Sequence, residues 1–268
     1  MRPRLDKSVG RTFFGANAAT YEAVRPGHPD DVYELLVDRC GLRAGSKVLE
    51  IGPGTGKATR RLLELGADPL VAIEPDPELA DFLRGAFGDR VEVRVTALED
   101  AELEADAFDL AAAASSFHWV DEEVGLAKLA AALRSGGWIA IWWTNFGDDT
   151  RPDPFRDAVD PLFEEIPHGP SGPANPGRPG FTLDAEERLA ALAKTGFEEL
   201  EHDLFRWTRA WDTEGIRGLY STFSPISALS PARHEEFLDA VARVAEVDFG
   251  GHVEKPLLTV LYTARKTV

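Results

Sequence analysis

The segment that most limits how this chain can fold runs from Val48 to Lys57, with the sequence Val-Leu-Glu-Ile-Gly-Pro-Gly-Thr-Gly-Lys. Residues that favour β-structure lead directly into three glycines, and a helical pattern starts at once after them. Because glycine has no Cβ, the backbone can turn sharply there and a ligand can approach it closely. The order of strand, glycine loop and helix predicts a ligand site at the carboxyl end of the strand, although a plain tight turn has the same pattern.

Short apolar runs and helical patterns alternate from residue 29 to residue 143. Strands are predicted at 47–51, 70–73, 91–95, 108–113 and 138–144. Helices of about 10–12 residues separate them, and one of these is expected to start at Asp76-Pro77 and another at Asp121. Strands joined by helices form right-handed βαβ units, so the predicted fold class is α/β, with a parallel sheet covered on both faces.

Residues 147–181 interrupt this alternation. Prolines stand at every third position from Pro167 to Pro179, with glycines between them. This spacing favours an extended polyproline conformation, so we expect a loop beside the site; a ligand for a proline-binding partner is the alternative. Regular patterns return with helices at 184–194 and 230–247 and strands at 197–206 and 257–264.

The charge balance excludes several classes of partner. Lys and Arg contribute 29 positive charges and Asp and Glu 46 negative ones, a net charge of −17. Such a field repels phosphate backbones and anionic lipids, so we expect no nucleic-acid partner and no membrane surface. Cys40 is the single cysteine, and no apolar run approaches the ~20 residues of a membrane helix. We therefore expect a reduced, cytoplasmic protein without a metal site.

A carboxylate follows the second predicted strand. Glu74 comes eighteen residues after Gly56, where it can accept hydrogen bonds from both hydroxyls of a ribose, although a surface acid is the simpler reading. The loop pattern is G-x-G-x-G, and Glu50 precedes it, a charge that would repel a pyrophosphate but can orient an ammonium group. These charges favour S-adenosylmethionine over a nicotinamide dinucleotide.

Motifs in a fixed order resemble those of the class I S-adenosylmethionine-dependent methyltransferases, in their small-molecule branch of type 11 and trans-aconitate methyltransferase-like proteins. They are Glu50–Gly56 for motif I, Ile73–Asp76 after it, Thr96–Asp100 for the adenine segment, Phe108–Leu110 through Ser115–Trp119 for the fourth motif, Leu133–Gly137 for the turn before the fifth strand, and Tyr21–Pro26 for the N-terminal lead-in. The resemblance implies a Rossmann-like fold with a mostly parallel seven-stranded sheet. It also implies S-adenosylmethionine as cofactor, S-adenosylhomocysteine as product and a small-molecule acceptor.

The same resemblance assigns roles to matched positions. The methionine part of the cofactor is expected at Glu50 and the loop, the ribose at Glu74, and the adenine at the third strand. The full set of expected cofactor residues is Tyr21, Arg25, Glu50, Gly52, Pro53, Gly54, Gly56, Glu74, Pro75, Ala97, Leu98, Glu99 and Ser115. Many relatives have Asp at the position of Ala97, so the adenine amino group is expected to use Glu99 or backbone.

His118 is the candidate catalytic residue. A histidine with an ordinary pKa near ~6.5 can take a proton from an acceptor that must lose one. A packing or cofactor-facing role is the alternative, because His-Trp follows the fourth strand in this family whatever the substrate.

We expect one methyltransferase domain over 1–268. It comprises an N-terminal cover at 1–40, a cofactor-binding core at 41–145, the Pro/Gly-rich insert at 146–182, and C-terminal helices with the last two strands at 183–268. The alternatives are a nicotinamide-dependent oxidoreductase and a protein that binds S-adenosylmethionine without turnover.

Overall fold

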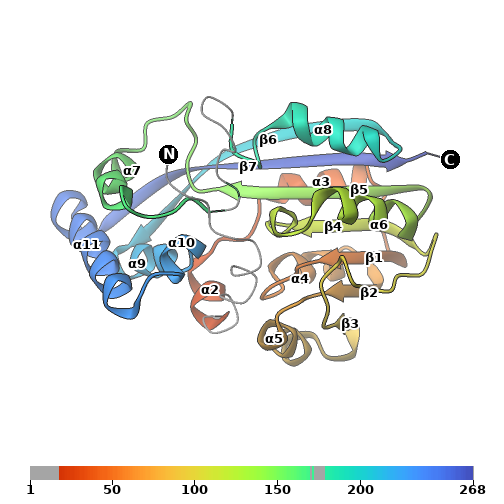
Figure 1. Ribbon diagram of the computed structural model, residues 1–268, viewed down its shortest axis with the longest axis horizontal. Coiled ribbons are helices and arrows are strands. Elements are labelled where there is room, and N and C mark those ends of the chain that lie inside the picture. The colour runs from red at the N-terminus through yellow and green to blue at the C-terminus, as the bar shows by residue number, and fades with distance from the viewer. Residues whose placement is uncertain (1–17, 170, 172–178, 268) are drawn as a thin grey trace.

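The computed structural model describes residues 18–169, 171 and 179–267, and its centre is one twisted sheet (Figure 1). The strands lie in the order β3-β2-β1-β4-β5-β7-β6. Their bounds are β1 (Ser46–Ile51), β2 (Ala67–Ile73), β3 (Val91–Arg94), β4 (Phe108–Ala114), β5 (Leu133–Asn145), β6 (Phe197–Asp212) and β7 (His252–Lys266). Strands β1 to β5 pair in parallel, while β7 is antiparallel to both β5 and β6. The predicted mostly parallel, seven-stranded α/β fold is confirmed.

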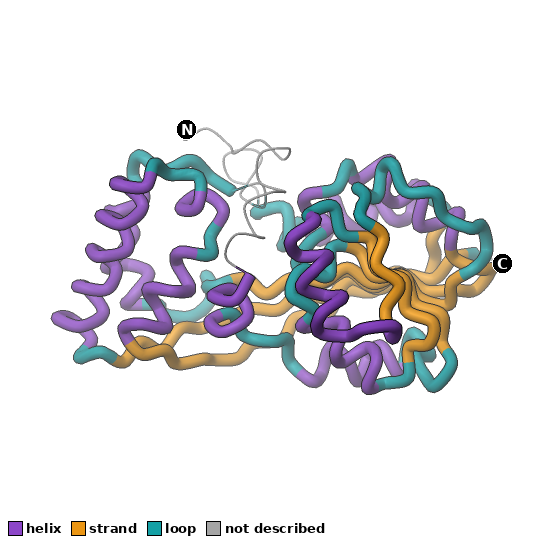
Figure 2. Tube along the Cα trace, turned by 90° about the horizontal axis from the view of Figure 1, so that it is seen from below, coloured by secondary structure: helices purple, strands orange, loops and turns teal. Residues whose placement is uncertain are grey.

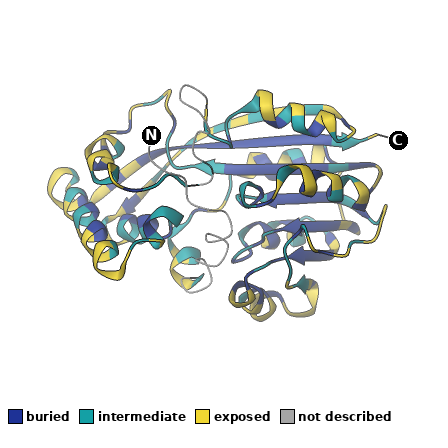
Figure 3. Ribbon diagram, viewed as in Figure 1, coloured by how far each residue is buried: buried dark blue, intermediate teal, exposed yellow. Residues whose placement is uncertain are grey.

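Helices cover both faces of the sheet because residues that alternate along each strand point to opposite sides. On one face, Val48, Ala72 and Trp142 pack with α3 (Asp30–Asp38), α4 (Lys57–Glu64) and α5 (Pro77–Phe87). On the other, Leu49 and Ile141 pack with α6 (Glu122–Ala132) and α8 (Ala185–Lys194). Figure 3 shows the inner strands as the buried layer, and the edge strand β6 and the outer sides of the helices as largely exposed or intermediate.

Two helices beside the site begin where the sequence predicts. Asp76 caps α5 by accepting hydrogen bonds from the backbone N–H groups of Glu78 and Leu79, and Pro77 occupies its first turn. The Asp121 carboxylate accepts the backbone N–H of Val124 at the start of α6. These caps direct the two helices away from the carboxyl ends of β2 and β4, where the site lies.

A second group of helices lies beyond the parallel strands. It consists of α7 (Pro154–Val159), α9 (Thr213–Ser221), α10 (Ser224–Ser227) and α11 (Pro231–Phe249), together with the short N-terminal helix α2 (Ala18–Val24), which contacts α9. The ends of β6 and β7 extend past β5 into this group, as Figure 2 shows. Phe155, Leu219 and Val241 form its core with Val253 of β7.

Three expectations about the borders differ from the structure. Strands β6 and β7 are longer than predicted, because each continues to pair with the other where β5 has ended. Helix α3 is not a cover, since its Val32 and Leu36 are fully buried in the core. The insert contains the unexpected helix α7, while residues 170 and 172–178, which include three prolines of the proline repeat, lie outside the described residues.

Among the described residues, none of the helices combines the length and the apolar character needed to cross a bilayer.

Candidate active site

The glycine loop joins β1 to α4 and lies against the first turn after β4. The backbone N–H of Gly52 donates to the Ile73 carbonyl at 2.9 Å, which ties the loop to the end of β2. Gly52 has a φ of +61°, and a Cβ there would lie 2.6 Å from the Cβ of Ser116. Gly54 has a φ of +60°, but a Cβ there would meet no atom within 4 Å, because this residue faces open space. The loop thus packs tightly on one side and presents bare backbone on the other.

Glu74 stands at the end of β2 and holds the glycine loop. Its Oε2 accepts the Gly54 N–H at 3.1 Å, and its Oε1 accepts the Asp76 N–H at 3.0 Å. The side chain is 4% exposed, so it is not an ordinary surface acid. Burial raises the pKa of Glu74 to about 7, against the two backbone donors, which lower it. Each carboxylate oxygen keeps a lone pair with which it can accept a further donor.

Glu50 lies beneath the loop, under its backbone. Its side chain is 1% exposed and accepts a hydrogen bond from Thr59 Oγ1 of α4 at 2.7 Å on Oε2. The other oxygen, Oε1, has no hydrogen-bond partner among the described residues. Burial raises the pKa of Glu50 to about 8, so the carboxyl is largely protonated at neutral pH. The sequence predicts a direct contact between Glu50 and a ligand ammonium group. In the structure Glu50 lies below the loop backbone and does not line the pocket, so this contact stays a prediction.

The raised pKa of Glu50 predicts how stability changes with pH. The ordinary pKa of a glutamate carboxyl is 4.5, so the unfolded chain releases the Glu50 proton above that pH. The native state keeps this proton up to a pH of about 8. The stability that Glu50 contributes is therefore fully present below pH 4.5 and is lost as pH rises to about 8, by at most about 1.4 kcal/mol per pH unit. Glu50→Gln should remove this slope, measured by chemical denaturation between pH 5.5 and 8.5. Equal slopes in wild type and variant would show that Glu50 does not titrate as inferred.

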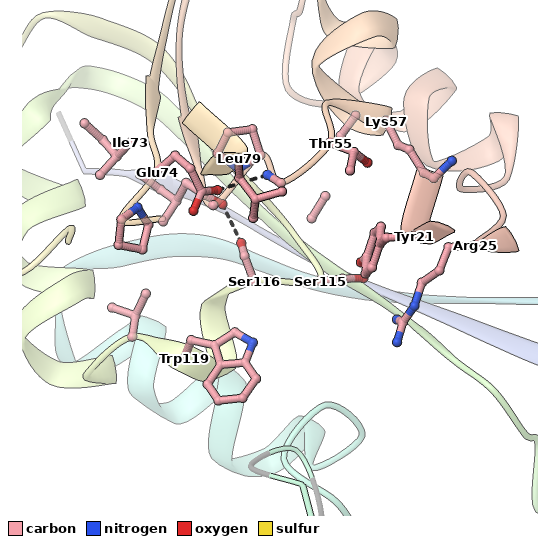
Figure 4. Close-up of a pocket in the computed structure, with 18 of the residues that line it drawn as sticks. Tyr21, Arg25, Thr55, Lys57, Ile73, Glu74, Leu79, Ser115, Ser116 and Trp119 are labelled. Carbon is pink, nitrogen blue, oxygen red and sulfur yellow. Dashed lines mark hydrogen bonds between the residues drawn. The ribbon is translucent and has the colours of Figure 1, made fainter. Parts of the chain in front are cut away.

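A single open pocket extends over the carboxyl ends of β1, β2, β4 and β5, with about 1140 Å³ of space, solvent at its mouth included. Eleven of the predicted site residues line it: Tyr21, Arg25, Gly52, Pro53, Gly54, Glu74, Pro75, Ala97, Leu98, Glu99 and Ser115. Figure 4 shows Glu74 on one side of this pocket and Tyr21 and Arg25 on the other. Segments at or after the ends of all five parallel strands, together with the N-terminal helix, thus converge on one space.

Glu50, Gly56 and His118 do not line the pocket. Gly56 packs against the Phe87 ring of α5, in a space that a Cβ would fill. His118 lies in the 3₁₀ turn η3 (Phe117–Trp119), where its Nδ1 accepts the Trp143 Nε1–H at 3.0 Å. The His118 ring also lies 5.1 Å from that of Trp119. This geometry fits the packing role better than the catalytic one, which stays a prediction.

The turn after β4 adds a strained residue to the pocket wall. Ser115 has a φ of 54°, a left-handed conformation that costs a non-glycine residue on the order of 1 kcal/mol, and its N–H donates to the Trp142 carbonyl at 2.7 Å. The next residue, Ser116, donates its hydroxyl hydrogen to the Ile51 carbonyl of β1. The turn is therefore fixed to both neighbouring strands, which holds its backbone at the pocket.

Several pocket residues are absent from the predicted set of cofactor residues, and four of them lie together. Pro26 and His28 come from the segment between α2 and α3, and Thr144 and Phe146 from the end of β5. The His28 Nδ1 is 3.2 Å from Thr144 Oγ1, and burial, with a smaller effect of Lys57, lowers the His28 pKa to about 4, so this imidazole is neutral. Thr144 and Phe146 could have been found from their position at the end of a parallel strand, because residues there face the edge of the sheet at which ligands bind.

Comparisons with known proteins agree with this geometry. A family model described as a methyltransferase domain matches residues 49–141. An uncharacterised methyltransferase of Schizosaccharomyces pombe is 28% identical over 263 residues, which cover 96% of this chain and 98% of that one. An uncharacterised methyltransferase of Mycobacterium tuberculosis is 37% identical over 140 residues, 52% of this chain and about half (54%) of the relative.

A solved structure shares the fold at low identity. Phosphoethanolamine N-methyltransferase 2 of Haemonchus contortus, in complex with phosphomonomethylethanolamine and S-adenosylhomocysteine, superposes with a TM-score of 0.58. The two chains are 15% identical, and the match covers 97% of this chain and 60% of the other. Residues 49–141 thus form a methyltransferase domain, and the chain has the fold of the class I S-adenosylmethionine-dependent methyltransferases.

The pocket of this methyltransferase fits its cofactor, S-adenosylmethionine. The bare backbone at Gly54 leaves room for a ligand, and Glu74 offers carboxylate oxygens beside it. The Thr55 hydroxyl lines the same wall, is buried, and has no hydrogen-bond partner among the described residues. An ammonium, a carboxylate and a ribose carry donors and acceptors that match these groups. Within the described part of the chain, no group of three or more His, Cys, Asp or Glu side chains could hold a metal ion.

Proposed function

We propose that this methyltransferase transfers the methyl group of S-adenosylmethionine to a small-molecule acceptor. The observation that carries the proposal is the continuity of the pocket, which runs from Glu74 and the glycine loop to a second region lined by Tyr21, His28 and Phe146. The first region matches the cofactor, which leaves the second for the acceptor. A net charge of −17 further favours a small molecule over a nucleic acid. Cys40, buried and unpaired, is compatible with a reducing cytoplasm as the place of this activity.

The roles of the cofactor-binding residues form part of this proposal. Glu74 accepts the ribose hydroxyls while it keeps its bonds to the loop, and Gly52 to Thr55 surround the methionine part. Residues 97–99, after β3, surround the adenine: Leu98 is 2% exposed and supplies an apolar wall, and Glu99 Oε1 accepts the Asp121 N–H at 2.9 Å, which fixes this segment to α6. Glu50 acts from below by supporting α4 through Thr59.

Catalysis in this site depends mainly on orientation. When bound, S-adenosylmethionine supplies an activated methyl group: a lone pair of the acceptor forms the new bond to the methyl carbon, and the electron pair of the broken carbon–sulfur bond stays on sulfur. The chain's task is to align the acceptor with that bond and to exclude water. The His28 imidazole, which lies 3.2 Å from Thr144 Oγ1, has a pKa lowered to about 4 and is a weak base, so its role is to orient groups at the pocket wall and not to take a proton.

Calorimetry tests the cofactor side of the proposal. We expect titration heat with S-adenosylmethionine and S-adenosylhomocysteine and none with NAD⁺ or NADP⁺ at equal concentration, because the Gly54 N–H of the loop, a donor that a pyrophosphate would need, already donates to the Glu74 carboxylate. Incubation with S-adenosylmethionine and a mixture of small metabolites should then release S-adenosylhomocysteine. Binding of a dinucleotide in place of the two sulfur nucleosides would overturn the proposal.

A further inference from the structure

Four side chains from separate segments of the chain form a continuous series of hydrogen bonds that ends at the pocket. His28, between α2 and α3, has its Nδ1 3.2 Å from Thr144 Oγ1 at the end of β5. Thr144 Oγ1 lies 2.9 Å from Thr259 Oγ1 of β7. Thr259 Oγ1 also accepts the indole Nε1–H of Trp207, on β6, at 3.0 Å. These four residues are called the cross-strand network below.

The pairing of the strands brings three members of the network together. Thr144 and Thr259 lie directly opposite each other in the antiparallel pair of β5 and β7. Trp207 pairs with Leu257, two positions from Thr259, so it is the diagonal neighbour of Thr259 on the same face of the sheet. His28 joins them from outside the sheet and lines the pocket. The network therefore connects the edge strand β6 with the ligand site.

The chemistry of the groups gives the network a direction. An indole donates and cannot accept, so Trp207 cannot take the hydroxyl hydrogen of Thr259. Thr259 is 0% exposed, and among the described residues Thr144 Oγ1 is the acceptor that this hydrogen can reach. A buried hydroxyl hydrogen without an acceptor would cost about 1–3 kcal/mol. Thr259 therefore donates to Thr144.

The direction continues to the imidazole. A hydroxyl that accepts a hydrogen bond becomes a better donor, and the lone pair of His28 Nδ1 is the acceptor that the Thr144 hydrogen can reach among the described residues. Burial, with a smaller effect of Lys57, lowers the pKa of His28 to about 4, so the ring carries one proton at neutral pH. With Nδ1 acting as acceptor, that proton is on Nε2.

The Nε2–H of His28 is available to a ligand. Nε2 has no hydrogen-bond partner among the described residues, while the residue lines the pocket. The ring lies 5.7 Å from that of Trp142 in an edge contact at 85°, and Nδ1 is held by Thr144. Packing on one side and a hydrogen bond on the other restrict rotation of the imidazole.

We propose that Thr259 is a positioning residue of the pocket: acting through Thr144, it holds His28 in the tautomer with its proton on Nε2, so that this wall presents a hydrogen-bond donor in place of a base. An N–H donor binds a lone pair and makes the atom that it binds a poorer nucleophile. His28 therefore holds an atom of the bound ligand other than the one that attacks the methyl group. This last consequence rests on the proposed function, whereas the tautomer does not.

Nitrogen NMR of the full-length protein with ¹⁵N-labelled histidine tests the tautomer at neutral pH without ligand. The His28 signals are identified by their loss in His28→Gln. We expect Nδ1 to have the shift of an unprotonated ring nitrogen and Nε2 that of a protonated one. Thr259→Val removes the hydroxyl and keeps the side-chain shape. Because Thr144 is then free to turn its hydrogen away, the other tautomer becomes populated and the two nitrogen shifts should move toward each other.

Three further variants separate this effect from a general disturbance of the sheet. Thr259→Ser keeps the hydroxyl and should retain the wild-type shifts. Thr263→Val is the matched control, because Thr263 of β7 is also 0% exposed but accepts a hydrogen bond from Arg39, outside the network. Thr144→Val removes the last link and should change the shifts as Thr259→Val does, which keeps the test decisive if one of the two valine variants does not fold.

The wild-type spectrum alone can contradict the inference. A protonated Nδ1, or two shifts that are already averaged, would overturn it. Unchanged shifts in Thr259→Val or Thr144→Val with a native-like thermal melt, or an equal change in Thr263→Val, would also overturn it. The measurement uses no cofactor, so a protein that binds no sulfur nucleoside would overturn the proposed function and leave the tautomer result in place.

Discussion

Replacing Glu74 by alanine should weaken binding of S-adenosylhomocysteine by about tenfold to a hundredfold. The carboxylate would lose the ribose hydroxyls, and hydrogen bonds to a charged acceptor contribute about 1.5–3 kcal/mol. Its two present bonds, from the N–H groups of Gly54 and Asp76, are lost as well, so the loop itself becomes less ordered. Calorimetry gives the affinity, and a thermal melt shows how far the fold is affected.

Two further variants identify the cause of that loss. Glu78→Ala removes an exposed carboxylate on the neighbouring helix and should leave affinity unchanged. Glu74→Gln removes the titrating group, so the rise in wild-type affinity that we expect as pH passes about 7, where Glu74 ionises, should be absent. Unchanged affinity in Glu74→Ala, with a native-like melt, would show that Glu74 does not contact the ribose.

Replacing Gly52 by alanine should destabilise the protein by about 2–6 kcal/mol. The new Cβ would lie 2.6 Å from the Cβ of Ser116, and the residue would have to keep a φ of +61°. Overpacking and left-handed strain each cost about 1–3 kcal/mol. Chemical denaturation measures this loss, and we expect cofactor binding to fall with it.

Gly54→Ala is the matched control for Gly52→Ala. Its φ of +60° imposes the same backbone strain, but its Cβ would meet no atom within 4 Å. This variant should lose only the strain energy, about 1–3 kcal/mol, while its methyl group enters the pocket and weakens the cofactor. The double variant Gly52→Ala with Ser116→Gly should recover part of the stability. Equal losses in the two single alanine variants would show that the contact with Ser116 is unimportant.

The parts of the site that follow one another closely in sequence were predictable. The glycines follow one predicted strand, and a carboxylate follows the next predicted strand. Both can be recognised from sequence because they belong to a single βαβ unit, whose geometry is strict. The fold class follows from the same local alternation. Asp76 and Asp121 were identified as helix caps because capping depends only on neighbouring residues.

Contacts between distant segments could not be derived in this way. Arg25 meets Thr222, 197 positions later, because α9 packs beside α2, and no periodicity in the chain encodes that packing. Contacts with other elements also determine where His118 and Glu50 lie: His118 accepts a hydrogen bond from Trp143 of β5, and Glu50 accepts one from Thr59 of α4. A motif gives the position of a residue along the chain. The direction of its side chain depends on the space that remains between the sheet and the neighbouring helix.

The long β6–β7 ladder limits how the pocket can open. After an irregularity between Glu198 and Glu201, the ladder is continuous from Glu201–Thr263 to Asp212–His252, and its far end packs with the core of α9 and α11. A hinge between the parallel sheet and these helices would have to break the pairing of β6 with β7. We therefore expect the sheet and the helices to move together. Helix α2 bridges them with few bonds, among them Lys57 to Glu22, Arg25 to Thr222, and Trp211 Nε1 to the Val24 carbonyl. We therefore expect variants of these α2 anchors to change this wall of the pocket without altering the sheet.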